Sequence, residues 1–297
     1  MNTEHTDIYT RITDQIIAAL EKCSEANSRW KRPWHCPNME NVLPMNAKTG
    51  LHYRGVNVIA LWATAQELNY INGLWATFRQ WQELGAQVRK GEKSSPVVFW
   101  SSREKKGTDH RDTTDPTERD TLLFAKTYHV FNVSQVDGYQ EPTKAPLTED
   151  RLLKAEQYFS RVGVTVREAT KAFYRGSDDT VYMPPFASFF CKEGYYATLS
   201  HEVTHWTGHE TRLNRDMKNR FGDDAYALEE LVAELGAAFL CAELNVSNEP
   251  REDHAVYIKS WLKVLKQDKR EIFSAASKAQ AACDWLSKAS QTERKAA

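Results

Sequence analysis

Apolar residues recur at helical spacing along much of the chain. Residues 7–22 carry Ile8, Ile12, Ile16 and Leu20 between polar positions, which predicts an amphipathic helix with one face on a protein core. The same spacing predicts further helices, one of them stopped by Gly85. They cover residues 56–68, 76–84, 148–162, 188–208, 225–244 and most of 254–286.

Two pairs of runs rich in β-branched and aromatic residues predict strands. Residues 96–100 and 122–136 are expected to pair as antiparallel strands, and the almost wholly polar residues 101–120 between them to form a solvated, mobile hairpin loop. Residues 164–167 and 180–183 form the second pair, around a Gly-Ser turn. Residues 27–49 contain three prolines and little periodicity, so an irregular segment is expected there.

This mixture of helices and strands predicts an α+β fold in two parts. The stretch 137–146 combines a turn signal with two prolines and no apolar period, so the predicted boundary follows residue 145. A length of 297 residues suits an N-terminal domain of residues 1–145 and a C-terminal domain of residues 146–297.

Composition and charge narrow the class of protein. No run reaches the roughly 18 apolar residues of a membrane span, and the first residues are too polar and acidic for a signal peptide, so we expect a cytoplasmic protein with no membrane partner. The five cysteines are scattered and never spaced C-x-x-C, which argues against disulfides and cysteine-bound zinc.

Charge is unevenly distributed along the chain. Residues 22–93 carry ten Lys or Arg against five Asp or Glu, whereas residues 146–297 carry 21 against 23. Any attraction for polyanions therefore belongs to the N-terminal half.

The clearest chemical motif is His201-Glu-Val-Thr-His205. Histidines four residues apart on a helix share a face, so both imidazoles can bind one metal ion. Glu202 lies beside them as the candidate general base, which would take a proton from water bound to the metal. This spacing is typical of zinc metallopeptidases.

A third protein ligand is needed, and helix geometry favours a downstream glutamate. Thr211 stands where a metzincin would carry histidine, and His209 would lie about 12 Å from His201 along a continuing helix. Glu230 and Glu234 share a helix face, so Glu230 is predicted to bind the metal, as in a gluzincin, and Glu234 to accept the free N–H of a ligating histidine.

Glu229 is the alternative third ligand. These glutamates could also form a solvated helix face, but burying three carboxylates among alanines and a glycine would be costly without a cation. We expect one divalent ion, zinc by the motif, with manganese and other ions open because such sites accept several metals.

The residues around the motif resemble a known family. Residues 195–209, continuing through 212–215 to 229–240, resemble the zincin-like metallopeptidase domain of ArdC antirestriction proteins. Residues 53–57, 75–81, 88–93 and 128–133 resemble the single-stranded-DNA-binding region that these proteins share with plasmid-encoded primases. The resemblance implies a plasmid-borne protein that binds DNA entering by conjugation and protects it from host restriction. It also implies His201, His205 and a glutamate of the 229–230 pair as metal ligands, with Glu202 as the base.

Aromatic and basic residues are interleaved in the N-terminal half. Six of the nine tryptophans fall in the first hundred residues among lysines and arginines, and binding a single strand without sequence preference needs both kinds of side chain. Trp62 is expected in the core, on the apolar face of a helix. The predicted DNA contacts are Arg54, Arg89, Lys90 and Lys93, together with Trp30, Lys31, Arg32 and Trp34.

Two functions share these features. In the first, the protein coats single-stranded DNA and protects it from restriction by steric means. In the second, it is a metal-dependent peptidase that cleaves a host protein or a regulatory protein, and DNA binding only brings it to its target. For such a peptidase, residues 180–183 could align an extended substrate by pairing at a sheet edge.

Overall fold

The computed structural model describes residues 7–25, 43–104, 121–140, 151–189, 191–216, 224–246 and 255–291. The helices in these ranges are α1 (Ile8–Glu25), α2 (Val56–Glu67), α3 (Phe78–Glu83), α4 (Arg151–Val162), α5 (Lys192–Trp206), α6 (Asp224–Leu244), α7 (Ala255–Gln267) and α8 (Glu271–Gln291). The strands are β1 (Met45–Asn46), β2 (Leu74–Thr77), β3 (Gln87–Val88), β4 (Ser95–Glu104), β5 (Thr121–Asn132), β6 (Val136–Asp137), β7 (Val166–Glu168), β8 (Phe173–Arg175) and β9 (Thr180–Met183). This mixture confirms the predicted α+β fold class.

Parts of the sequence prediction fall outside these ranges. The expected loop at 101–120 and the expected boundary at 137–146 are only partly described. The boundary after residue 145 therefore stays a prediction.

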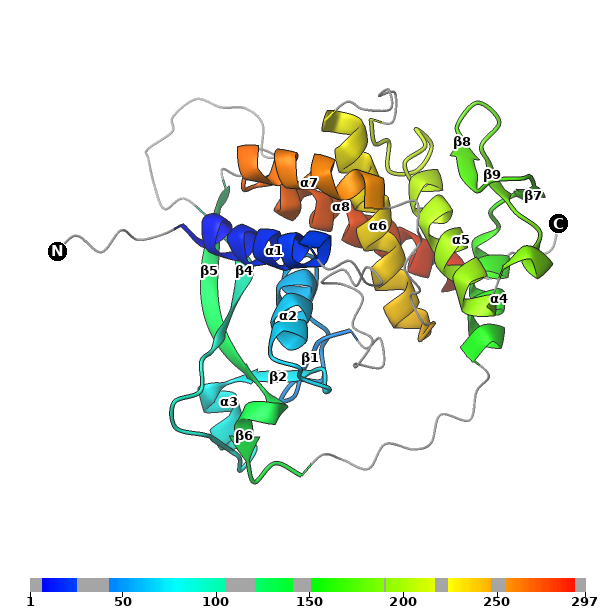
Figure 1. Cartoon of the computed structure of the whole chain (residues 1–297). Helices are drawn as coiled ribbons and strands as arrows, with labels where there is room; N and C mark the ends of the chain where they lie inside the picture. Colours follow the sequence, from blue (N-terminus) through cyan, green and yellow to red (C-terminus); the bar gives the residue numbers. More distant parts are fainter. Residues whose placement is uncertain are drawn as a thin grey trace, which may run out of the picture.

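The N-terminal half is built on a four-stranded sheet with the order β1-β2-β5-β4 (Figure 1). β4 and β5 pair as antiparallel strands from Ser95↔Val130 to Glu104↔Thr121, as the sequence predicted. The second strand ends earlier than residue 136, because Asn132 caps a 3-10 turn (Val133–Gln135): its side chain accepts from the Ser134 N–H at 2.9 Å. The chain then continues as β6, which pairs with β3.

The helix expected at 76–84 begins two residues later. β2 takes the residues up to Thr77, and a capping box then starts α3: the Thr77 hydroxyl accepts from the Gln80 N–H at 3.3 Å, and the Gln80 side chain accepts from the Thr77 N–H at 2.9 Å. Trp75 and Trp81 on either side of this junction are fully buried. Both tryptophans therefore belong to cores and not to a DNA surface.

In the C-terminal half, α5 and α6 pack against each other beside the three-stranded sheet β7-β9-β8. The helical stretch expected over 254–286 is two helices, separated where the Asp268 carboxylate accepts from the Arg270 N–H at 2.8 Å. Among the helices that the structure describes, none combines the length and the apolar character needed to cross a membrane.

One hydrophobic core runs through both halves. It includes Ile12 and Ile16 of α1, Ile59 of α2, Leu235 of α6 and Leu286 of α8. In Figure 1, α1 and α2 lie against α7 and α8, so the first and last helices of the chain are neighbours. The N-terminal half is thus attached to the C-terminal helices by packing as well as by the chain.

Polar contacts reinforce this junction. The Thr13 hydroxyl donates to the Lys269 carbonyl at 2.6 Å, and the Gly55 N–H donates to the Gln280 side chain at 3.1 Å. Arg54 forms an ion pair with Asp284 of α8. These contacts join α1 and the start of α2 to the last two helices.

Because the core is continuous, we expect the full chain to unfold in a single cooperative transition. Circular dichroism and tryptophan fluorescence should give coincident melting curves, and a divalent metal should shift the whole curve to higher temperature. Two transitions, of which the metal shifts only one, would instead show two halves that fold independently.

Candidate functional site

Helix α5 carries both histidines of the motif. It begins at Cys191, whose sulfur accepts from the Gly194 N–H at 3.3 Å, and its central residues are buried. The buried hydroxyls of Ser200 and Thr204 each donate to a carbonyl one turn earlier, at 2.7 Å. These bonds satisfy polar groups inside the packed helix. His201 and His205 are one helical turn apart, and their ring centroids lie 4.9 Å from each other.

Helix α6 places Glu230 opposite the two histidines. Its carboxylate oxygens lie 3.5 Å from the Nε2 atom of His201 and 3.5 Å from the Nε2 atom of His205. One ligand atom from each of these three residues lies within 4.8 Å of the others. Two imidazole nitrogens and a carboxylate form a donor set that suits a divalent metal ion.

The other nitrogen of each imidazole faces a second carboxylate. The Nδ1 atom of His201 lies 3.7 Å from Glu234, and the Nδ1 atom of His205 lies 3.3 Å from Glu229. A ligating histidine usually donates its second N–H to such a group, which fixes the ring and raises its basicity. Glu234 thus lies next to His201, and its role as the acceptor of that N–H stays a prediction. Glu202 is also buried in this part of α5.

Arg215 was missed by the sequence reasoning. Its guanidinium binds both oxygens of Glu229, at 2.8 and 3.1 Å, and donates to the carbonyl of Thr204 at 2.7 Å. Glu229 is therefore held by Arg215 and His205, which favours Glu230 as the third ligand. Asn214, directly before Arg215, has φ 45°, and asparagine is among the few residues that tolerate this region.

Burial and charge oppose each other at this centre. Burial alone would lower the pKa of His205, but the carboxylates of Glu229 and Glu230 outweigh it and raise that pKa to about 10. Burial would likewise raise the pKa of Glu230, yet His201 and His205 hold it well below its usual range. Without a metal, the carboxylates therefore favour a protonated His205.

His209 and strand β9 do not have the roles that the sequence left open for them. α5 ends at Trp206, and His209 contacts the Thr211 hydroxyl at 2.9 Å, outside the group of convergent ligand atoms. The idea that residues 180–183 offer a free sheet edge is wrong: β9 pairs with β7 on one side and β8 on the other. A substrate cannot extend the sheet along β9, since both its edges are already bonded.

The predicted DNA contacts divide into three groups. Trp30, Lys31, Arg32 and Trp34 lie outside the described residues. Arg54 is paired with Asp284, and Arg89 binds Asp137 at 3.3 Å and Glu92 at 3.0 Å. Lys90 and Lys93 are exposed. Trp62 is buried, as expected.

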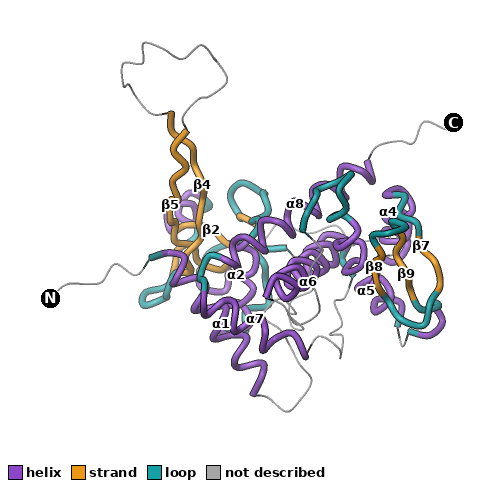
Figure 2. The backbone as a smooth tube through the Cα atoms, turned by 90° about the horizontal axis from the view of Figure 1, so that it is seen from above, coloured by secondary structure: helices purple, strands orange, loops and turns teal. Residues whose placement is uncertain are grey.

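The structure exposes an aromatic surface that the sequence reasoning did not single out. β4 and β5 form a long two-stranded ribbon that projects from the body of the molecule (Figure 2). Phe99 and Tyr128 are 50% and 36% exposed on it, with ring centroids 5.4 Å apart, and the Lys126 ammonium lies 5.0 Å from the Tyr128 ring. Aromatic residues in strands are usually buried in a core, so the sequence did not distinguish these exposed rings from core residues.

Comparison with known proteins covers both halves. Residues 153–278 match the family described as zincin-like metallopeptidase, and residues 6–131 match the N-terminal domain of anti-restriction factor ArdC. The metal-free crystal structure of the antirestriction ArdC protein from plasmid R388 is 39% identical, with a TM-score of 0.77 over 96% of this chain and 98% of that one. The Mn(II)-bound structure gives 40% identity and a TM-score of 0.75 over 97% and 100%.

Two relatives known from sequence differ in length. "Uncharacterized protein y4eC" of Sinorhizobium fredii is 46% identical over 95% of this chain and 92% of its own length. A protein named DNA primase TraC, from Escherichia coli, is 34% identical over 95% of this chain but only 27% of its own length. This chain therefore corresponds to about a quarter of that primase.

The two candidate ligands on α6 can be separated by mutation. We expect Glu230→Gln to weaken Mn²⁺ or Zn²⁺ binding by about 100-fold or more, because it removes a ligand charge. Glu229→Gln, which alters the partner of His205 and of Arg215 but removes no ligand, should weaken binding about tenfold. Competition with a chromophoric chelator measures both dissociation constants. A larger loss for Glu229→Gln would identify that residue as the ligand.

Metal binding should also depend on pH. A metal ion binds neutral imidazole, so it must displace the proton that the carboxylates hold on His205 below a pKa of about 10. We expect the apparent affinity to rise about tenfold per pH unit below that pKa, as one proton is released. Calorimetry in buffers of different ionisation enthalpy counts that proton, and an affinity independent of pH between about 6.5 and 8.5 would contradict the assignment.

Proposed function

Since the chain belongs to the ArdC family of antirestriction proteins, we propose that it binds single-stranded DNA and protects incoming plasmid DNA from host restriction in the cytoplasm. The observation that carries this proposal is the exposed aromatic and cationic surface of the β4–β5 ribbon. The N-terminal match to ArdC and the similarity to a segment of proteins named DNA primase support it.

The ribbon offers what a single strand needs. Unpaired bases stack on exposed rings such as those of Phe99 and Tyr128, and Lys126 can approach a phosphate. Neither contact reads base identity, so binding should be independent of sequence and should weaken with salt. A duplex, whose bases are already stacked, gains little from such a surface.

We also propose a metal centre, which is not needed for DNA binding. His201, His205 and Glu230 would hold a divalent ion, which we propose to be zinc, with manganese as the alternative. Such an ion supplies Lewis acidity for hydrolysis when bound. Glu202, beside the histidines in sequence and buried with them, would accept and return a proton.

A second function, cleavage of a host or regulatory protein, is favoured by that buried Glu202. It needs both a bound substrate and proton transfer at Glu202. The steric function needs neither, because coverage of the strand is then enough to block a nuclease.

Two sets of variants separate these functions. Replacing Phe99 and Tyr128 by alanine and Lys126 by glutamine should weaken binding to oligothymidylate about tenfold or more, through lost stacking and charge, and should reduce protection in parallel. Glu202→Gln should leave both DNA affinity and protection unchanged. Affinity is measured by fluorescence anisotropy, and protection by plasmid transfer into restricting and non-restricting recipients.

Glu210→Gln, at an exposed position just beyond the motif, is the matched control for Glu202→Gln. Loss of protection in Glu202→Gln alone, with DNA affinity intact, would show that cleavage is the function. Equal binding of duplex and single strand would contradict the DNA part of the proposal.

A further inference from the structure

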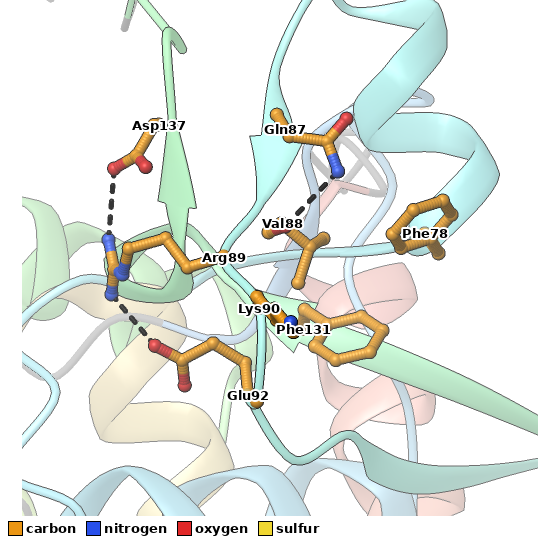
Figure 3. A pocket seen from close by; sticks show the side chains of 9 residues that line it. Phe78, Gln87, Val88, Arg89, Lys90, Glu92, Phe131 and Asp137 are labelled. Carbon is orange, nitrogen blue, oxygen red and sulfur yellow. Dashed lines mark hydrogen bonds and ion pairs between the residues drawn. The ribbon is translucent and has the colours of Figure 1, made fainter.

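A second feature of the N-terminal half is an open pocket between α3, the β3–β6 pair and the end of β5 (Figure 3). Its volume is about 550 Å³, within the range of about 300–1,000 Å³ that is usual for small-ligand sites. Phe78, Gln87, Lys90, Phe131 and the Arg89 ion-pair group are among the residues that line it.

One end of the pocket is closed by ion pairs. The Arg89 guanidinium bonds Asp137 and Glu92 and also donates to the carbonyl of Ser134, while the second oxygen of Glu92 accepts from the Gln135 side chain at 3.0 Å. These bonds join β3 and the residues that follow it to β6 and to the 3-10 turn that precedes β6. Arg89 therefore has a structural role in the pocket, and its positive charge is neutralised by Glu92 and Asp137.

Two phenylalanines and a lysine also line the pocket. Phe78 is 43% exposed, and its ring centroid lies 6.4 Å from that of Phe131 with the planes at 69°. The backbone of Phe131 is held in place, because its carbonyl accepts from the Trp81 indole N–H at 3.0 Å. Lys90, labelled in Figure 3, is exposed and lines the same pocket.

The turn that carries Lys90 is set by its backbone. The Glu92 N–H donates to the Arg89 carbonyl at 3.4 Å, and Gly91 has φ 91°, the value that the third position of a type II turn requires. Lys90 thus occupies the second position of this turn. It makes no ion pair with any part of the chain that the structure describes.

We propose that this pocket takes one unstacked base of a DNA single strand, stacked on Phe78 and edged by Phe131, with the adjoining phosphate on Lys90. This inference rests on the proposed single-strand binding and names a subsite for it, separate from the exposed rings of Phe99 and Tyr128 and located where β5 pairs with β2. A flat ring matches an exposed aromatic face, and the single unpaired lysine matches one phosphate.

Fluorescence anisotropy on the full chain, with a labelled oligothymidylate of about 12 nucleotides, tests the subsite. We expect Phe78→Ala to weaken binding about tenfold and Phe78→Trp to retain it, because a tryptophan ring restores the platform. Lys90→Gln should lower the slope of log Kd against log salt by about 0.7, the share of one phosphate. Phe173→Ala, whose ring is 40% exposed in the other half, is the control and should bind as wild type.

A strand of abasic sites probes the base directly. It should bind the wild-type protein more weakly than oligothymidylate does, and Phe78→Ala should reduce that difference. If the wild-type protein binds oligothymidylate but Phe78→Ala binds equally well, the pocket is not a base site while the proposed function stands. If the wild-type protein does not bind the strand at all, the proposed function itself fails. Displacement by micromolar thymidine monophosphate would mark a free-nucleotide pocket and overturn the assignment to a strand.

Discussion

The burial of carboxylates between α5 and α6 is the constraint on which the site depends. Glu202, Glu230 and Glu234 are 4, 8 and 3% exposed, and Glu229 is nearly as well covered. With neutral imidazoles and one arginine, these four carboxylates leave a formal charge of −3, which a divalent ion reduces to −1. Because uncompensated charge is costly in a packed interior, the arginine, the histidines and the cation form one set that has to be present together.

Close helix packing makes that compensation possible. A Cβ atom on Gly236 would lie 2.5 Å from the Thr204 side chain, which is fully buried and bonded to the Ser200 carbonyl. Only glycine lets α6 approach α5 this closely, and the approach sets the 3.5 Å distances between Glu230 and the histidine nitrogens. α6 also packs against α7 and α8, which contact α1 and α2, so the same packing reaches the N-terminal half.

Much of this could be predicted from sequence, because it depends on short-range spacing. The i and i+4 positions of His201 and His205, and of Glu230 and Glu234, define helix faces, and the β-branched and aromatic residues of 96–100 indicate a strand. What could not be predicted depends on contacts between distant residues. Arg215 contacts Glu229 across 14 positions of sequence, and β9 has no free edge because residues 173–175, which show no strand pattern, also form a strand.

Ion pairs between residues distant in sequence explain why the roles of the basic residues could not be predicted. Arg54 and Arg89 both occur in exposed, basic stretches, yet one joins α2 to α8 and the other joins β3 to β6. An arginine next to a glycine turn is suited equally to a phosphate and to a carboxylate of its own chain, and only the fold decides between them. Lys90 and Lys126 have no carboxylate partner among the residues that the structure describes, and such lysines are better indicators of a polyanion surface than the density of positive charge along the sequence. The same holds for aromatic rings. Trp75 and Trp81 are buried in cores, whereas Phe78 and Phe99 are partly exposed, so only the latter two can stack on a base.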